Sequence, residues 1–261
     1  MLKTRLIPIL FLKNGLIVRS ETFSDFREIG NPINQLKRLS DWEIDELIYV
    51  DITREGGYDL KRSDHKIKGK KEIISILKEI AKSTSMPLTF GGRIKSIEQV
   101  DAYMANGADK VIINTGVYDS PELISNVSSK YGSQAIVVGI DIKKEGTLYN
   151  MYVKNGQKKV KDDPLNYAKK VESLGAGEIF INSIDRDGTG KGYDINIIKK
   201  IISSVNIPVI AAGGAGTFDD FIELAEETCV SAIAAGNIFN FTEHAYPRAK
   251  KELKRAGINV R

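Results

Sequence analysis

Short apolar runs alternate with amphipathic stretches along the chain. Each run is continuous rather than alternating in polarity, which is typical of strands buried on both faces of a parallel sheet. The predicted strands occupy residues 6–12, 46–52, 87–90, 110–114, 135–141, 178–184, 208–212 and 232–235. The amphipathic stretches predict helices at residues 32–42, 71–82, 97–106, 121–131, 164–174, 195–205, 218–226 and about 243–254.

Eight strands alternating with eight helices predict an α/β fold, a (β/α)8 TIM barrel formed as one domain over residues 1–261. Pro32, Pro121 and Pro164 stand at or near predicted helix starts. Proline is favoured there because the first turn of a helix does not use its amide donors. The prolines therefore agree with the predicted helix boundaries.

Two segments interrupt the regular alternation. Residues 53–69, after the second strand, are rich in Gly and Lys and lie where a barrel builds its active face. Residues 147–160 contain Asn155-Gly156, preceded by apolar residues at Leu148, Met151 and Val153. The dipeptide predicts a hairpin with a tight turn.

The two halves of the chain follow one plan. An apolar run that starts at a proline ends in paired glycines at Gly91-Gly92 and again at Gly213-Gly214. This repetition predicts a barrel built from two similar half-barrels. The first strand of each half ends differently, however, at Phe11 in one half and at Asp141 in the other.

Composition and charge exclude several classes of function. The 261 residues include 38 Lys and Arg and 34 Asp and Glu, giving a net charge of +4. No basic run is interleaved with aromatic residues, so we expect no nucleic-acid partner, and the mild positive charge favours small anionic substrates. No apolar run approaches the ~18 residues of a membrane span, and the first residues lack a signal-peptide pattern. We therefore expect a cytoplasmic protein without a membrane partner.

The single cysteine and the two histidines predict no metal or redox site. Cys229 has no partner for an intrachain disulfide, and because apolar residues follow it we expect it to be buried. His65 and His244 lack the spacing of metal ligands. We expect neither a metal nor another cofactor.

Two kinds of side chain stand at the predicted carboxyl ends of the strands, where a barrel places its active site. The first kind is small or carries an amide or hydroxyl: Gly92, Asn114, Thr115, Gly213, Gly214, Gly236 and Asn237. Small residues let backbone amides converge on an anion. Because the repeat places two such groups half a turn apart, we expect two phosphate sites and a substrate with a phosphate at each end. Tight loops that merely need glycine are the alternative.

The second kind of strand-end side chain is acidic, at Asp51, Asp141, Asp185 and Asp187. Carboxylates in a pocket suit proton transfer. We take Asp141 as the leading catalytic candidate because it ends a buried apolar run, and Asp187 as the second. The alternative for residues 185–188 is a salt-bridged turn.

The chain resembles one family over nearly its whole length, on five stretches: residues 44–52, 107–115, 132–141, 183–189 and 212–216. The family is the cyclase subunit of imidazole glycerol phosphate synthase, the HisF family. The resemblance implies a (β/α)8 barrel with a glutaminase subunit docked on its amino-terminal face, and a lyase-type synthase. Ammonia would pass through the barrel to a substrate with two phosphates.

The resemblance also assigns roles to single residues. It implies an ammonia entrance formed by Arg5, Glu46, Lys110 and Glu178, and phosphate sites at the Gly, Asn and Thr positions named above. Asp141 matches one catalytic aspartate, and Phe11 stands at the position of the other. Asp109, beside the entrance, is expected to contact the glutaminase.

The departures from the family gather on the catalytic face. Phe11 replaces an aspartate, Arg93 replaces a glycine of the first phosphate loop, and Asn182 and Ala212 replace hydroxyl residues. The 53–69 loop is longer than the family's. This pattern resembles second-copy cyclase-like proteins of saccharide gene sets, which accompany a glutaminase-like protein and a sugar amidotransferase.

Three functions follow from these observations. The first is an ammonia-channelling subunit of a glutamine amidotransferase that serves glycosyl amidation in surface-polysaccharide biosynthesis. Its partners would be a glutaminase in a heterodimer, a phosphorylated or nucleotide-like substrate and a sugar amidotransferase. The second is an authentic cyclase subunit of histidine biosynthesis. The third is a non-catalytic scaffold that activates a glutaminase.

Overall fold

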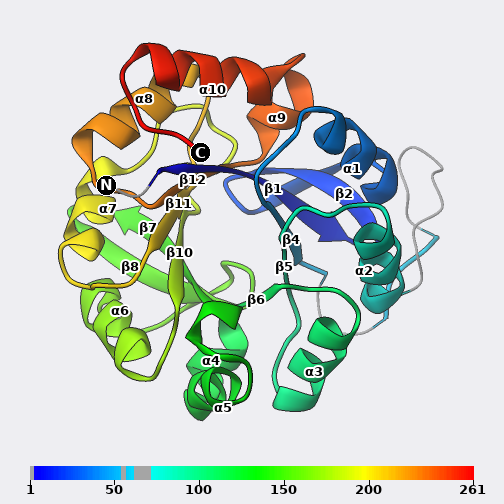
Figure 1. Ribbon diagram of the computed structural model, residues 1–261. Helices are drawn as coiled ribbons and strands as arrows, with labels where there is room; N and C mark the ends of the chain where they lie inside the picture. The colour runs from blue at the N-terminus through cyan, green and yellow to red at the C-terminus, as the bar shows by residue number, and fades with distance from the viewer. Residues whose placement is uncertain (1–2, 54–56, 62–71) are drawn as a thin grey trace.

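The computed structural model describes residues 3–53, 57–61 and 72–261. Within these residues, eight parallel strands form a closed barrel ringed by helices (Figure 1). The barrel strands are β1 (Arg5–Lys13), β4 (Leu47–Asp51), β5 (Leu88–Gly91), β6 (Lys110–Ile113), β7 (Ile136–Glu145), β10 (Glu178–Ser183), β11 (Val209–Ala212) and β12 (Ala232–Ala235). Closure comes from the parallel pairs β1–β12 and β7–β10. The predicted (β/α)8 barrel is confirmed.

The predicted helices form close to their expected boundaries, although the start predicted at residue 71 lies outside the described residues. They are α1 (Pro32–Asp41), α2 (Ile73–Lys82), α3 (Ile97–Ala105), α5 (Glu122–Tyr131), α6 (Pro164–Ser173), α7 (Ile195–Ile202), α8 (Phe218–Glu227) and α10 (Ala245–Arg255). Pro32 and Pro164 open their helices behind the side-chain caps Asn31 and Asp163, whereas Pro121 is itself the cap of α5.

Three short helices lie outside the prediction: α4 (Thr115–Asp119), α9 (Asn237–Phe241) and the 3-10 turn η1 (Ser133–Ala135). Helices α4 and α9 follow β6 and β12, which are corresponding strands of the two half-barrels. Both are five residues long, and such short segments carry no measurable helical periodicity. Their equivalent places support the predicted internal repeat.

Two layers of apolar side chains hold the barrel together, because successive side chains of a strand point to opposite faces. One layer packs between the strands and the helices. The other fills the barrel interior and includes Ile7, Ile9, Ile48, Ile112 and Phe180, all under 6% exposed. The interior is thus a packed core, as in other barrels of this kind.

Two hairpins extend the barrel where the strands end. The first, β2 (Leu16–Glu21) and β3 (Asp25–Gly30), follows β1 and was not predicted. Its residues mix polar and apolar types, and its turn places Thr22 and Phe23 at φ 50° and 53°, a left-handed conformation that neither residue type favours. The sequence therefore carries no turn signal there.

The second hairpin follows the fifth barrel strand. Strand β7 runs past Asp141 to Glu145 and pairs with β8 (Leu148–Val153), which in turn pairs with β9 (Lys158–Lys159). Asn155 and Gly156 lie in the turn at φ 54° and 73°, so the predicted Asn-Gly turn is confirmed.

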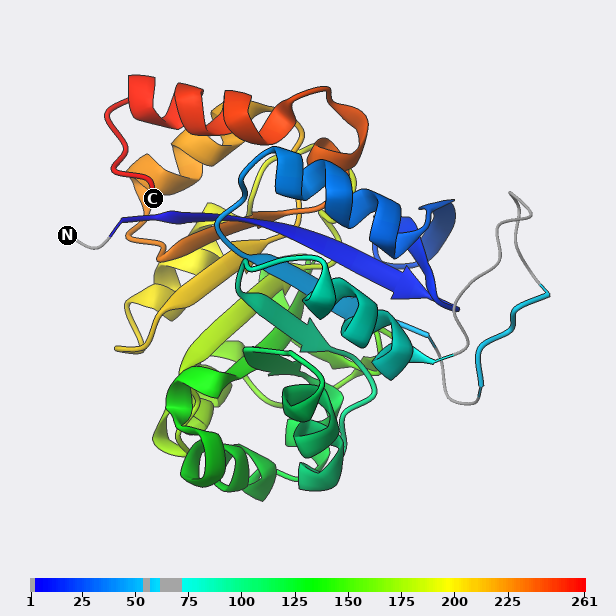
Figure 2. The same ribbon diagram turned by 45° about the vertical axis from the view of Figure 1, so that its right-hand side comes forward.

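The chain ends of the barrel lie together at one side. Figure 2 shows the first and last described segments at the end where the strands begin, opposite the β2–β3 hairpin. Thr4 pairs in parallel with Val260, and the Arg261 amide donates to the Thr4 carbonyl at 3.1 Å. We call the end where the barrel strands begin the amino face and the opposite end the carboxyl face.

The prediction of a buried Cys229 was wrong. Its side chain is exposed, because the residue lies in the loop between α8 and β12, and such connections run over the surface. His65 and most of the predicted 53–69 loop lie outside the described residues. No helix of the described residues is long and apolar enough to cross a membrane.

Candidate functional site

Asp141 lies buried at the carboxyl face between two amide side chains. The Nδ2 atoms of Asn114 and Asn182 donate to its two carboxylate oxygens at 2.9 and 3.5 Å. Burial raises the pKa of Asp141 to about 7; the Asn182 hydrogen bond opposes the rise, and the nearby Asp187 charge adds to it. A carboxyl that titrates near neutral pH is suited to both giving and taking a proton.

Asp187 is the second acid of this site. Burial raises its pKa to about 6. Its Oδ2 atom is buried and has no hydrogen-bond partner among the described residues, which is unusual for a carboxylate oxygen. The two acids predicted from sequence therefore lie close enough for the charge of Asp187 to raise the pKa of Asp141.

Phe11 lies near the carboxyl end of β1 and lines the same pocket as Asp187. Its side chain is 7% exposed, and its ring stands edge-on to that of Phe23 at the tip of the β2–β3 hairpin. Phe23 in turn contacts Phe26, with ring centroids 5.8 Å apart. Phe11, Phe23 and Phe26 thus form an apolar aromatic cluster beside the site.

The candidate phosphate site of the second half is assembled in the fold. One pocket is lined by Gly213, Gly214, Gly236 and Asn237 together with Phe11 and Asp187. A Cβ atom on Gly214, at φ 117°, would lie 2.0 Å from the Gly192 carbonyl oxygen. Backbone packing therefore requires this glycine whether or not an anion binds, so the tight-loop alternative stays open.

The residues of the candidate phosphate site in the first half are engaged in contacts within the protein. The Thr115 hydroxyl accepts a hydrogen bond from the Lys154 amide at 2.9 Å, in the turn of the β8–β9 hairpin. The Asn114 amide is directed at Asp141. Gly92 packs against β4, since a Cβ there would lie 2.1 Å from the Asp51 carbonyl oxygen. Arg93 is exposed and left-handed at φ 62°.

Of the remaining strand-end acids, Asp51 has structural partners. Asp51 accepts hydrogen bonds from the Thr53 amide at 2.9 Å and the Tyr58 hydroxyl at 2.8 Å. Burial raises its pKa, opposed by these hydrogen bonds and by the charge of Arg93. In the turn after β10, Arg186 pairs with Asp194 at 3.7 Å.

The amino face carries a ring of four charged side chains, as the sequence predicted. Arg5 contacts Glu46 at 3.0 Å and Glu178 at 2.7 Å. Lys110 contacts Glu178 and lies 3.8 Å from Glu46. Although burial alone would raise the pKa of Glu178, the hydrogen bonds and charges of Arg5 and Lys110 lower it. Both glutamates therefore belong to one closed ion-pair network with Arg5 and Lys110.

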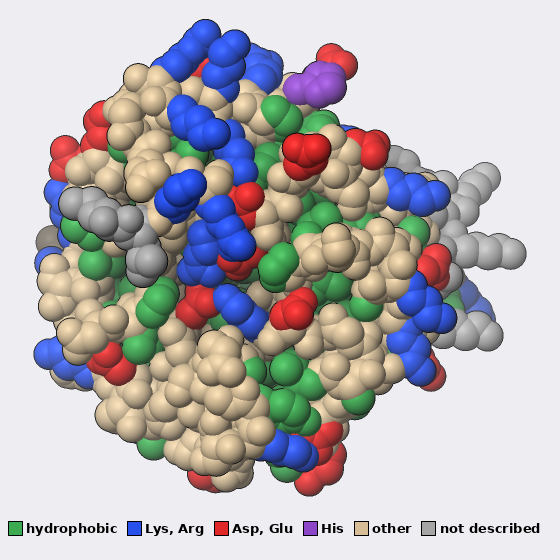
Figure 3. Space-filling view, viewed as in Figure 1, with side chains coloured by type: hydrophobic (Ala, Val, Ile, Leu, Met, Phe, Trp, Pro, Cys, Tyr) green, Lys and Arg blue, Asp and Glu red, His purple; other side chains and the backbone are tan. Residues whose placement is uncertain are grey.

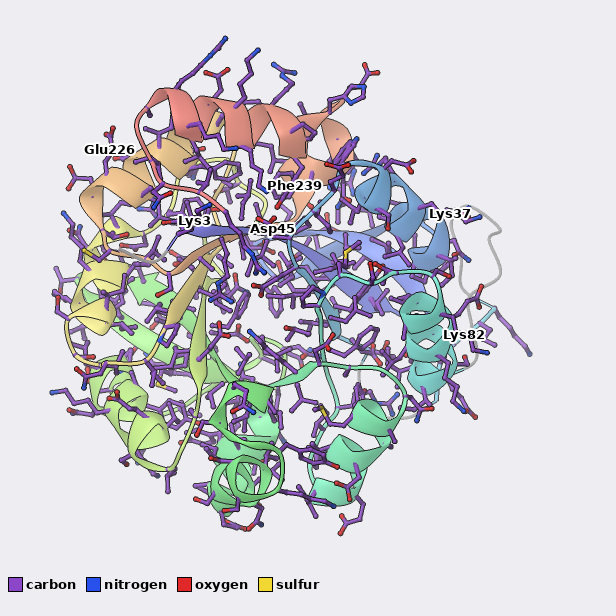
Figure 4. The ribbon with its side chains drawn as sticks, in the orientation of Figure 1. Lys3, Lys37, Asp45, Lys82, Glu226 and Phe239 are labelled. Atoms are coloured by element: carbon purple, nitrogen blue, oxygen red, sulfur yellow. The ribbon has the colours of Figure 1, made fainter. Side chains whose placement is uncertain are left out.

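A fifth member of the network could not be found from sequence. Arg261 reaches Glu46 at 3.3 Å because the pairing of Thr4 with Val260 carries the last residues to the amino face. Asp45 lies beside the ring near the middle of this face (Figure 4). Asp109 is exposed next to Lys110, and its Oδ2 accepts a hydrogen bond from the Leu88 amide at 2.8 Å.

Among the residues that the structure describes, no three His, Cys, Asp or Glu side chains form a group able to hold a metal ion. His244 is exposed at the start of α10, where its ring lies 6.3 Å from that of Trp42.

Comparison with known proteins points to one family. Residues 5–245 match the family described as histidine biosynthesis protein. The chain is 40% identical to the "Imidazole glycerol phosphate synthase subunit HisF" of Sulfolobus acidocaldarius over 261 residues, covering all of both chains. It is 39% identical to the "Putative imidazole glycerol phosphate synthase subunit hisF2" of Vibrio vulnificus strain YJ016, covering all of this chain and 92% of that one.

Proposed function

The chain belongs to the HisF family of histidine biosynthesis proteins, and we propose that it is the ammonia-channelling subunit of a glutamine amidotransferase that amidates a sugar of a surface polysaccharide. The proposal takes residues 1–261 as one barrel domain. It also takes the protein as cytoplasmic, because a glutaminase partner and a soluble sugar substrate would be found there.

The main support for this proposal is the apolar environment of Phe11. In the HisF-like site a second carboxylate is expected opposite Asp141, and here a phenyl ring is packed against Phe23 with centroids 5.3 Å apart. A phenyl group cannot move a proton, and losing a general acid or base removes about two to four powers of ten in rate. Ordinary cyclase chemistry is therefore disfavoured.

The charged ring supports continued use of ammonia. Buried ion pairs contribute little net stability because desolvation offsets their attraction. A ring of Arg5, Glu46, Lys110 and Glu178 is thus a poor device for stability alone. It is a good polar opening into an otherwise apolar barrel, at the face where a glutaminase subunit would dock.

Substrate binding would use the carboxyl face. The pocket of Gly213, Gly214, Gly236 and Asn237 offers backbone amides to a phosphate, as in a phosphorylated or nucleotide-like sugar. Asp141 would exchange a proton with the ammonium or ammonia that arrives through the barrel, since its pKa of about 7 lies near physiological pH. A sugar amidotransferase would complete the system.

An authentic cyclase of histidine biosynthesis is the second candidate, favoured by the two buried acids Asp141 and Asp187 with pKa values of about 7 and about 6. A scaffold that only activates a glutaminase is the third. All three share the amino-face partner and differ in what occurs at the carboxyl face.

The test supplies the purified protein with the bisphosphate substrate of the cyclase and an ammonium salt. The proposal expects turnover at least ~100-fold below that of a HisF relative assayed in parallel. Turnover within tenfold of the relative would establish the histidine-pathway alternative. Separately, a glutaminase encoded in the same genome should bind the protein and hydrolyse glutamine faster in its presence, and failure to do both would contradict all three functions.

A further inference from the structure

Helix α10 presents a strongly basic surface beside the charged ring. Its inner face buries Ala245, Tyr246, Ala249 and Leu253 against the barrel. Its outer face carries Arg248, Lys250, Lys251, Lys254 and Arg255, with Glu252 as the only acid of the helix. Figure 3 shows Lys and Arg side chains gathered over α10 and continuing toward the middle of the amino face.

Not all of these cations are neutralised within the chain. Lys250 pairs with Asp45 and Arg255 with Glu252, each at 2.8 Å. Lys251 and Lys254 are exposed and make no ion pair with any described residue. Like charges three or four residues apart destabilise a helix slightly, so this arrangement does not serve the stability of α10.

Several of the same cations line a hollow that also contains the ring of Trp42. Trp42, Glu43 and Pro247 line it together with Lys250, Lys251, Lys254 and Arg255, and the buried Tyr246 lies behind them. The Arg38 guanidinium lies 5.1 Å from the Trp42 ring centre and holds that ring. Aromatic side chains are enriched at protein interfaces. The hollow therefore combines the apolar Trp42 and Pro247 with long cationic side chains.

Tyr246 connects the hollow to the charged ring through two hydrogen bonds. The Tyr246 hydroxyl accepts a hydrogen bond from the Asp45 amide and donates to the Leu6 carbonyl, each at 3.0 Å. Asp45 immediately precedes Glu46 of the ring, and Leu6 immediately follows Arg5. A partner that covers the ring would thus meet the hollow directly.

We infer that the α10 hollow, defined by Trp42, Pro247, Lys250, Lys251 and Lys254, is the docking site for an acidic surface of the glutaminase subunit. The inference rests on the proposed function and specifies the chemistry of the partner. The buried inner face of α10 leaves no apolar stripe for a membrane. No basic run of the chain is interleaved with the aromatic residues on which a nucleic-acid strand would stack.

Exposed cations of this kind act mainly on the rate of encounter. Charges at the rim of an interface change the association rate and its salt dependence more than the final contacts. Their reach is about 10 Å at 0.1 M salt. Lys251 and Lys254 should therefore speed docking at low salt and lose this effect at high salt.

The test compares two double variants with equal charge change. Lys251→Glu with Lys254→Glu alters the hollow, whereas Lys169→Glu with Lys170→Glu alters exposed residues of α6. Association with the glutaminase encoded in the same genome is followed by stopped-flow at low and high salt. We expect about tenfold slower association at low salt for the first pair, a flatter salt dependence, and little change for the second.

Several outcomes overturn the inference. Equal slowing by both pairs would show a general charge effect, and no slowing by the first would show that the hollow stays outside the interface. Loss of binding to phosphatidylserine vesicles, with unchanged glutaminase association, would assign the surface to a membrane. If the wild-type protein formed no complex at all, the proposed function itself would fail, and neither double variant would show measurable association.

Discussion

The ring of Phe11 stands edge-on to the ring of Phe23, with centroids 5.3 Å apart and planes at 77°. The first residue ends a barrel strand and the second forms the tip of a hairpin. This contact makes the carboxyl face of the barrel apolar at this point, and the same contact holds the hairpin in place.

Replacing Phe11 with Asp is therefore expected to destabilise the protein rather than restore a cyclase. The new carboxyl would face Phe23 in a site that is 7% exposed in the wild type. We expect a loss of at least ~3 kcal/mol in the free energy of unfolding, measured in urea. Phe11→Leu is the control and should lose less than about 1.5 kcal/mol. A stable, active Phe11→Asp variant would contradict this account of the mouth.

Inorganic phosphate is expected to bind beside Gly214. Its amide resonance, with those of Gly213 and Gly236, should shift when phosphate is titrated into the labelled protein. Gly214→Ala should abolish the shifts and destabilise the fold by about 1–3 kcal/mol, because φ is 117° and the Cβ would meet the Gly192 carbonyl. Gly146→Ala, at φ 61° but with open space around its Cβ, should keep them. Unshifted glycine amides at high phosphate would leave only the tight-loop interpretation.

The stability of the protein should fall as pH rises toward neutral because of Asp141. Its pKa is raised from 3.8 to about 7 in the folded protein, so the folded state holds a proton that the unfolded state has released. This contribution is complete below about pH 4, is lost as pH rises to about 7, and amounts to ~1.4 kcal/mol per pKa unit. Subtracting the urea stability curve of Asp141→Asn from that of the wild type isolates it. A flat difference between pH 4 and 7 would show that Asp141 is not buried as described.

Removing one acid from the charged ring should be costly. Glu178→Gln leaves Arg5 and Lys110 short of negative charge in a partly buried site, and we expect about 3 kcal/mol of destabilisation. The matched control is Glu252→Gln, which breaks the exposed pair with Arg255 and should change stability by less than ~0.5 kcal/mol. Equal effects of the two substitutions in urea would show that the ring is solvated like any surface pair.

Asp109 is expected to contact the glutaminase subunit, and its structural role dictates the control. Because its carboxylate accepts the Leu88 amide at 2.8 Å, Asp109→Lys removes a hydrogen bond as well as a charge. Asp109→Asn keeps an acceptor and removes only the charge. We expect about tenfold weaker binding for Asp109→Lys and a smaller loss for Asp109→Asn, measured by sedimentation. Unchanged affinity in both would move the interface away from this residue.

The barrel could be predicted from sequence because its strands are buried on both faces, which leaves continuous apolar runs at β1, β4 and β7. The β2–β3 hairpin could not, since its turn residues Thr22 and Phe23 adopt φ values that their side chains disfavour. Tertiary contacts fix that turn. Phe11 contacts Phe23, and the Thr22 amide donates to the Asp187 carbonyl.

In the candidate site, too, some features could be predicted from sequence and others could not. Asp141 and Asp187 were recognisable as acids at strand ends, and the four-residue ring was recognisable through a family resemblance. The contact of Arg261 with Glu46 was not, because it depends on a single bridge between Thr4 and Val260. The exposed Cys229 shows that apolar neighbours in sequence do not determine the side to which a loop residue points.

Each half-barrel carries a hairpin directly after its first strand, and the two hairpins meet. A Cβ on Gly156, in the turn after β8, would lie 3.2 Å from the Phe23 ring. If the two halves arose by duplication, each hairpin was copied together with its barrel strand, and the two hairpins now touch. A substitution in one hairpin would therefore change the packing of the other, so the two hairpins cannot vary independently.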